Sequence, residues 1–129
     1  MSDIAYSVAT WLDNMNIGVV GTDIYVGQIP DGIDGIWVER SGGQLNKYVP
    51  IEESVVDIYV KDHSAETAMS TLENIKRAIH RMHTTEVSTS YIYSFLVIGD
   101  IETVQRDLEY AKIFKITVQV MHRDTTIIS

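Results

Sequence analysis

Residues 51–83 read IEESVVDIYVKDHSAETAMSTLENIKRAIHRMH, and this stretch decides the fold. Its first ten residues alternate as a strand does, so that Val56, Ile58 and Val60 share one face and leave Asp57 and Tyr59 on the other. Apolar residues then recur at the helical period over about 64–83, with basic residues gathered toward the end, where they complement the helix dipole. A strong strand followed by a strong amphipathic helix predicts a fold that mixes the two kinds of element.

The flanking sequence extends this pattern to the order α-β-β-β-α-β-β. Residues 4–15 carry one apolar stripe of a helix, and Asn16 and Gly18 supply its end because both tolerate the left-handed conformation. Further strands are expected at 22–26, 36–40, 91–98 and 112–121. Segments 41–48 and 84–90 are expected to be loops.

The segment 91–98, YIYSFLVI, is apolar on both faces, which predicts a central position in the sheet. Gly99 and Asp100 are expected to end it. Residues 100–111 are ambiguous, since they are polar and acidic yet carry apolar residues at helical spacing. We therefore predict a single α+β domain over residues 1–129, with a mixed, mainly antiparallel sheet of about four to five strands and two helices packed on one face.

Composition narrows the classes of function. The 129 residues are 45% hydrophobic and 22% charged, and they include no cysteine, which removes thiol nucleophiles, disulfides and thiolate metal sites. The N-terminal stretch lacks the basic region of a secretory signal, and no apolar run reaches the roughly 18 residues of a membrane span. A net charge of −8 disfavours specific binding to nucleic acid.

Residues 30–43, PDGIDGIWVERSGG, concentrate glycine and proline as a phosphate-binding loop can. A phosphate loop needs GxxxxGK followed by Ser or Thr and then a helix, but Gly42-Gly43 is followed by Gln44 and Leu45. The dinucleotide pattern GxGxxG is absent as well. We interpret the segment as turns around a short strand.

Three further groups of residues resemble catalytic or metal sites, but the sequence supports none of them as such a site. Asp62, His63 and Ser64 are adjacent, whereas triad partners converge from separate elements, so Asp62 or Ser64 is expected to cap the second helix. His80 and His83 have the spacing of two metal ligands but lie among cationic residues. The acidic group is interpreted as a solvated face; it comprises Asp100, Glu102, Asp107 and Glu109. We predict no catalytic residue, no metal site and no cofactor.

Several segments together resemble a known family. They are the helix ending near Trp11-Leu12, IYVGQIPD at 24–31 followed by Gly42-Gly43, VVDIYV at 55–60, the long helix, and KITVQVMHRD at 115–124. In this order they resemble the tail terminator proteins of long-tailed bacteriophages, also called tail completion or minor capsid proteins. The resemblance covers most of the chain.

The resemblance implies a structural virion protein without enzymatic activity or cofactor. It implies a homohexameric ring that caps the tail tube, ends tube polymerisation and forms the head-attachment surface. The implied partners are further copies of the chain, the tail tube protein and a head-completion or connector protein, while DNA passes without specific binding and no membrane is involved. The implied location is the virion tail, assembled in the cytoplasm of the host bacterium.

Two alternatives stay open: a small dimeric ligand-binding or regulatory α+β domain, and a minor hydrolase that uses His63 or the acidic group. For a ring, exposed loops and strand edges should make the contacts. Ile127 and Ile128 either pair with another chain or complete the last strand of their own sheet. The interface candidates are Ile33, Asp34, Ile36, Arg40, Thr85, Glu86, Ile127 and Ile128.

Overall fold

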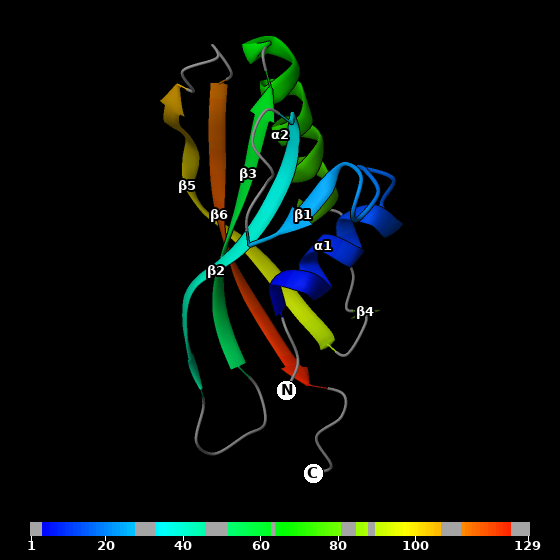
Figure 1. Ribbon diagram of the computed structural model, residues 1–129. Helices are drawn as coiled ribbons and strands as arrows, with labels where there is room; N and C mark the ends of the chain where they lie inside the picture. Colours follow the sequence, from blue (N-terminus) through cyan, green and yellow to red (C-terminus); the bar gives the residue numbers. More distant parts are fainter. Residues whose placement is uncertain are drawn as a thin grey trace.

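A computed structural model describes residues 4–27, 33–45, 52–62, 64–80, 85–87, 90–106 and 112–124. Two helices and six strands follow one another in the order α1 (Ile4–Asn14), β1 (Ile24–Val26), β2 (Gly35–Leu45), β3 (Glu52–Asp62), α2 (Ala65–His80), β4 (Thr85–Val87), β5 (Ser90–Arg106) and β6 (Lys112–Asp124). The strands form one sheet in the order β1-β2-β3-β6-β5-β4 (Figure 1). Of the described strands, β1 and β2 alone form a parallel pair, so the α+β class and the mixed, mainly antiparallel sheet are confirmed.

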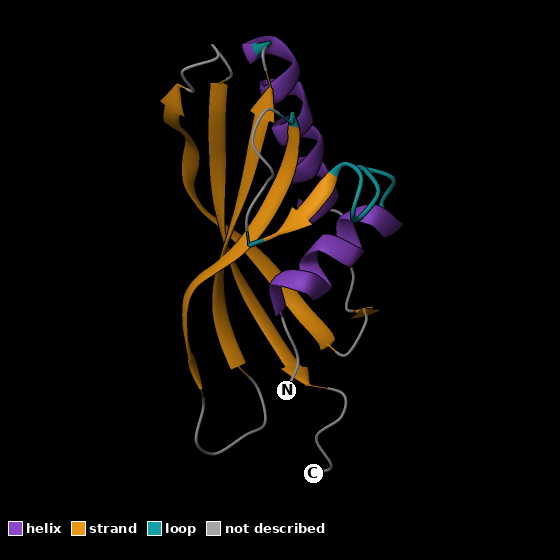
Figure 2. Cartoon of the chain, in the orientation of Figure 1, coloured by secondary structure: helices purple, strands orange, loops and turns teal. Residues whose placement is uncertain are grey.

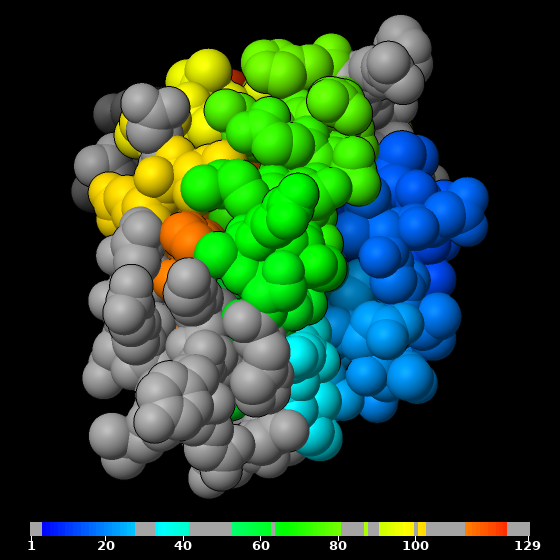
Figure 3. Space-filling view, turned by 90° about the horizontal axis from the view of Figure 1, so that it is seen from above, coloured from blue at the N-terminus to red at the C-terminus, as the bar shows by residue number. Residues whose placement is uncertain are grey.

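Both helices pack on the same side of this twisted sheet (Figure 2), as predicted. The alternation of β3 and β6 directs Val56, Ile58, Ile116 and Val118 into one core, where they meet the apolar stripes of α1 and α2. Seen from above, α2 lies between the α1–β1 region and β5 (Figure 3). The helices therefore cover one face of the sheet, and neither described helix covers the opposite face.

The helix ends agree with the sequence signals. Asn16 has a φ of 62°, and the Ile17 N–H donates to the Leu12 carbonyl at 3.0 Å, which closes α1 in the left-handed manner expected of asparagine. At the start of α2 the Thr67 N–H donates to Ser64 Oγ at 3.2 Å. Asp62 Oδ1 accepts from the Ser64 N–H at 2.8 Å and so fixes the capping residue.

Two predicted loops contain strands instead. The segment 41–48 was predicted to be a loop, but β2 continues through Gly42 and Gly43 to Leu45 and pairs with the first residues of β3, after an irregularity between Arg40 and Gly42. The segment 84–90 contains β4, which raises the strand count to six. In both places cross-strand pairing overrides weak local propensity, because β-structure depends on the neighbouring strand more than on the residue itself.

Strand β5 differs from prediction in length and in place. It does not end at Gly99: this glycine takes a φ of 74° within a register irregularity between Ile98 and Glu102, and the strand resumes to Arg106. Residues 100–106 are therefore strand rather than helix. Nor is β5 central, because only the three-residue β4 lies beyond it in the sheet.

Candidate interaction surface

The face of the sheet turned away from the helices carries a set of ordered side chains from four strands. We call it the open sheet face and define it by Trp37, Glu39, Val55, Asp57, Tyr59, Leu96, Ile98, Lys115, Thr117 and Gln119. These residues alternate with the core residues along β2, β3, β5 and β6. Neither described helix packs against this face.

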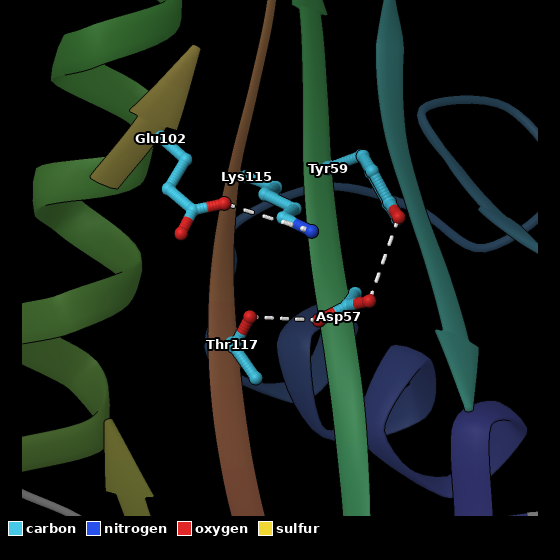
Figure 4. Close-up of polar contacts among 5 residues, drawn as sticks. All are labelled: Asp57, Tyr59, Glu102, Lys115 and Thr117. Atoms are coloured by element: carbon cyan, nitrogen blue, oxygen red, sulfur yellow. Dashed lines mark hydrogen bonds and ion pairs between the residues drawn. The ribbon is translucent and has the colours of Figure 1, made fainter. Parts of the chain in front are cut away.

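An aromatic and charged row crosses the open sheet face. The rings of Trp37 and Tyr59 stack with centroids 4.5 Å apart and planes at 2°. Next along the row, Lys115 Nζ lies 6.0 Å from the Tyr59 ring centroid and 3.7 Å from Glu102 Oε2 (Figure 4). The strand register places these residues opposite one another, so the row is a consequence of β2–β3–β6–β5 pairing.

A set of hydrogen bonds surrounds Asp57, whose side chain is buried. The Thr117 hydroxyl donates to Asp57 Oδ1 at 2.8 Å, and the Tyr59 hydroxyl donates to Oδ2 at 3.5 Å (Figure 4). These donors hold the carboxylate in place between β3 and β6. The open sheet face thus presents a fixed pattern of groups, which suits recognition of a partner surface.

Electrostatics on this face favour negative charge. Burial raises the pKa of Tyr59, and the carboxylates of Asp57 and Glu39 raise it further. The phenol therefore stays neutral and keeps its proton for Asp57. Glu39 and Asp57 of this face, and Glu102 beside Lys115, place three carboxylates along it, which opposes contact with a phosphate backbone.

At the β5 side the open sheet face becomes apolar. Leu96 is 60% exposed and Ile98 is 45% exposed, and Met121 of β6 is also exposed. Register places Leu96 opposite Gln119 and Ile98 opposite Thr117, so both apolar side chains extend the same face toward its β5 border. Clustered exposed apolar residues mark contact surfaces more often than scattered ones do.

One polar pair was not foreseen from sequence. Ser54 Oγ lies 2.7 Å from His122 Nε2, between β3 and β6, with the two residues 0% and 1% exposed on the helix-covered side. A serine beside a histidine has the composition of a nucleophile and its base. Burial denies a substrate access to this pair, so its role is to link two strands. No sequence motif could have revealed it, since the residues are 68 positions apart.

The predicted interface residues fall into different environments. Ile33 and Asp34 are exposed just before β2, and Arg40 is exposed at the β2 irregularity. Ile36 is only 4% exposed and packs in the core, which accounts for its apolar character without a partner. Thr85 and Glu86 belong to β4 rather than to a loop. Ile127 and Ile128 lie outside the described residues.

The structure describes some of the residues that resemble catalytic or metal sites in the sequence. His63, His83, Asp107 and Glu109 lie outside the described residues, whereas Glu102 is engaged with Lys115. Among the residues whose placement is described, no group of three or more histidine, aspartate or glutamate side chains could hold a metal ion. Within the same ranges, neither helix is long and apolar enough to cross a membrane.

Fold and surface together define a class: a small α+β protein with one sheet, helices on one face and a patterned contact surface on the other. Over residues 11–125 the chain matches the sequence model of a family described as bacteriophage tail terminator protein. The chain belongs to that family, as its resemblance predicted. It is a structural component of the phage tail. A search of curated proteins found no match.

Proposed function

We propose that the chain forms a homohexameric ring that caps the tail tube, ends its polymerisation and offers the surface to which the head attaches. The observation that carries this proposal is the family match over residues 11–125. The proposed partners are further copies of the chain, the tail tube protein and a head-completion or connector protein. Assembly takes place in the cytoplasm of the host bacterium.

The open sheet face supports a role in assembly. Its aromatic stack, its hydrogen-bonded carboxylate and its exposed Leu96 and Ile98 are fixed on strands rather than on loops. A surface that is rigid before contact loses little conformational entropy when a partner binds. Rigid strands also give each copy of the chain the same contact geometry, which a closed ring requires.

The acidic character of the chain supports passage of DNA without adhesion. The net charge of −8 and the carboxylates of Glu39, Asp57 and Glu102 repel phosphates at long range. We expect no retention of the protein on DNA at physiological salt. A charge-reversed variant, Glu39→Lys with Glu102→Lys, should gain weak retention that disappears as salt is raised, and salt-independent binding by the wild type would contradict this expectation.

Tube assembly in the presence of the protein tests the proposal. Purified tail tube protein should give tubes of uncontrolled length alone and shorter tubes with a ring at one end when the chain is added. Negative-stain images would show the ring and its position, and sizing with light scattering would give the number of copies. Binding along the sides of tubes, or unchanged tube lengths at saturating protein, would refute termination; a tight dimer that binds a metabolite would support the ligand-binding alternative.

A further inference from the structure

Among the described strands, the outer edge of β5 has no partner along most of its length. Strand β4 bonds only to residues 90–92, and no other described strand pairs with the outer side of residues 93–106. Unpaired edges expose backbone N–H and C=O groups that can bond to another strand. Register irregularities between Ile92 and Ser94 and between Ile98 and Glu102 bound this edge, so that Tyr93 lies at the first irregularity and residues 94–98 pair regularly with β6.

The sequence of residues 93–98 is poorly suited to exposure to solvent. Residues 93–98 read YSFLVI and contain neither a charge nor a proline, the devices by which natural edges prevent pairing. Leu96 and Ile98 project from the open sheet face, while Phe95 and Val97 are half-buried against the core. Apolar residues on both faces are typical of a strand whose two faces are both covered.

A groove lies beside this edge. It has a volume of about 300 Å³ and is lined by Ile79 and His80 at the end of α2 and by residues 93–97 of β5. A strand placed next to β5 would occupy space bordered by the end of α2. Its backbone would bond to the β5 edge and would lie beside the exposed Leu96.

A second edge without a described partner lies at the opposite end of the same sheet. Strand β1 bonds only to residues 36–38 of β2, and residues 42–45 pair with β3 on their inner side and with no described strand on their outer side. Two of these residues are Gly42 and Gly43. Glycine within a strand often marks a place where another backbone approaches closely.

We propose that residues 93–98 of one copy pair with residues 42–45 of the next, so that the sheet continues from copy to copy. The occupant is a second copy of this chain because a single chain carries both edges at opposite ends of one sheet. A ring built from heterologous contacts needs two different complementary patches on each copy, and these edges meet that need. The inference rests on the proposed ring and specifies which strands join it.

Cross-linking tests this pairing cleanly because the chain contains no cysteine. The exposed residues Leu96 and Ser41 serve as positions for Leu96→Cys and Ser41→Cys, joined by a short bis-maleimide that tolerates a small offset in register. The double variant should give a ladder of covalent oligomers. A mixture of the two single variants should stop at dimers, and each single variant alone should give none. Dimers from Leu96→Cys alone would mean symmetric β5–β5 pairing and would overturn the proposal.

Hydrogen exchange on the wild-type ring gives a second reading that needs no variant. Amides in 93–98 and 42–45 should exchange more slowly in the ring than in the dissociated chain.

The variant Leu96→Lys should raise the concentration for half-assembly by about tenfold or more, a change of about 1.4 kcal/mol. Its matched control is Val19→Lys, at a 52% exposed position after α1, which should assemble normally.

The outcomes separate this inference from the proposed function. A ring that forms without protection at 93–98, and without ladders from the double variant, overturns the edge pairing and leaves the ring intact. Equal effects of the two lysine variants would also overturn it. Failure to form a ring, alone or on tail tubes, refutes the proposed function and removes the basis of the inference. Protection of 93–98 in the dissociated chain would assign the edge to a segment of its own chain and overturn the proposal.

Discussion

The buried pair Ser54 and His122 gives a sharp test of how the two central strands are held together. The variant Ser54→Ala removes a hydroxyl from a site that is 0% exposed and takes from His122 Nε2 a partner at 2.7 Å. A buried polar group that loses its hydrogen bond costs about 1–3 kcal/mol, because it was desolvated on folding and now lacks that compensation. We therefore expect the free energy of unfolding to fall by about 2 kcal/mol.

Urea unfolding of the dissociated chain at pH 8 measures this change. With a denaturant slope of about 2 kcal/mol per molar, the midpoint should fall by about 1 M at an unchanged slope. The matched control is Ser94→Ala, at an exposed serine on β5 of the same sheet, which should change stability by less than about 0.5 kcal/mol.

A double-mutant cycle with His122→Leu then isolates the pair. Removing both partners should cost less than the sum of the two single changes, with a coupling of about 0.5–3 kcal/mol, because the double variant leaves neither half of this hydrogen bond behind. Additive costs, or a Ser54→Ala variant as stable as the wild type, would refute the assignment of this contact as a stabilising link between β3 and β6.

Two further predictions concern the two faces of the sheet. Ile58→Ala should lower the free energy of unfolding by about 2–5 kcal/mol because Ile58 is 1% exposed in the core. Ile98→Ala on the open sheet face should lower it by less than about 1 kcal/mol. Equal losses of stability in urea unfolding would show that the two faces are misassigned. The pKa of Tyr59 in the folded protein is raised above its ordinary value of 10.0. The neutral phenol of Tyr59 should therefore contribute its full share of stability below pH 10, and this share should be lost as the pH rises through the pKa of the folded state. Absorbance titration of the phenol should show this shift, Tyr59→Phe should remove the matching alkaline loss of stability, and Asp57→Asn should reduce the shift without abolishing it, since burial is the first cause.

Local patterns were sufficient for the elements whose period is long and regular. The stripe of α2, the alternation of β3 and β6 and a cap at Asp62 or Ser64 were predicted from residues within a few positions of one another. The structure contains the stripe and the alternation, and Ser64 is the cap. Such signals depend on geometry that the chain carries with it, namely a period of 3.6 or of 2 and a free N–H at a helix start. The α+β class follows from them directly.

Features that depend on pairing could not be predicted in this way. The stack of Trp37 on Tyr59 exists because of the β2–β3 register, and the contact between Ser54 and His122 exists because of the β3–β6 register. The local sequence of β2 does not predict that Gly42 and Gly43 continue a strand, since glycine is depleted from strands and common in turns. The partner strand supplies the hydrogen bonds that hold them there, and it lies in a different part of the sequence.

The wrong placement of β5 has a different origin. Its composition predicted a central position, but the described strands supply a full neighbour only on the β6 side. Composition records how much apolar surface must be buried but not which chain buries it. If the isolated chain were the complete unit, residues 93–98 should carry the lysine or proline that protects other edges. They carry neither, while the opposite end of the sheet offers two glycines on an unpaired edge. The proposed pairing between copies would supply the neighbour that the described strands do not provide.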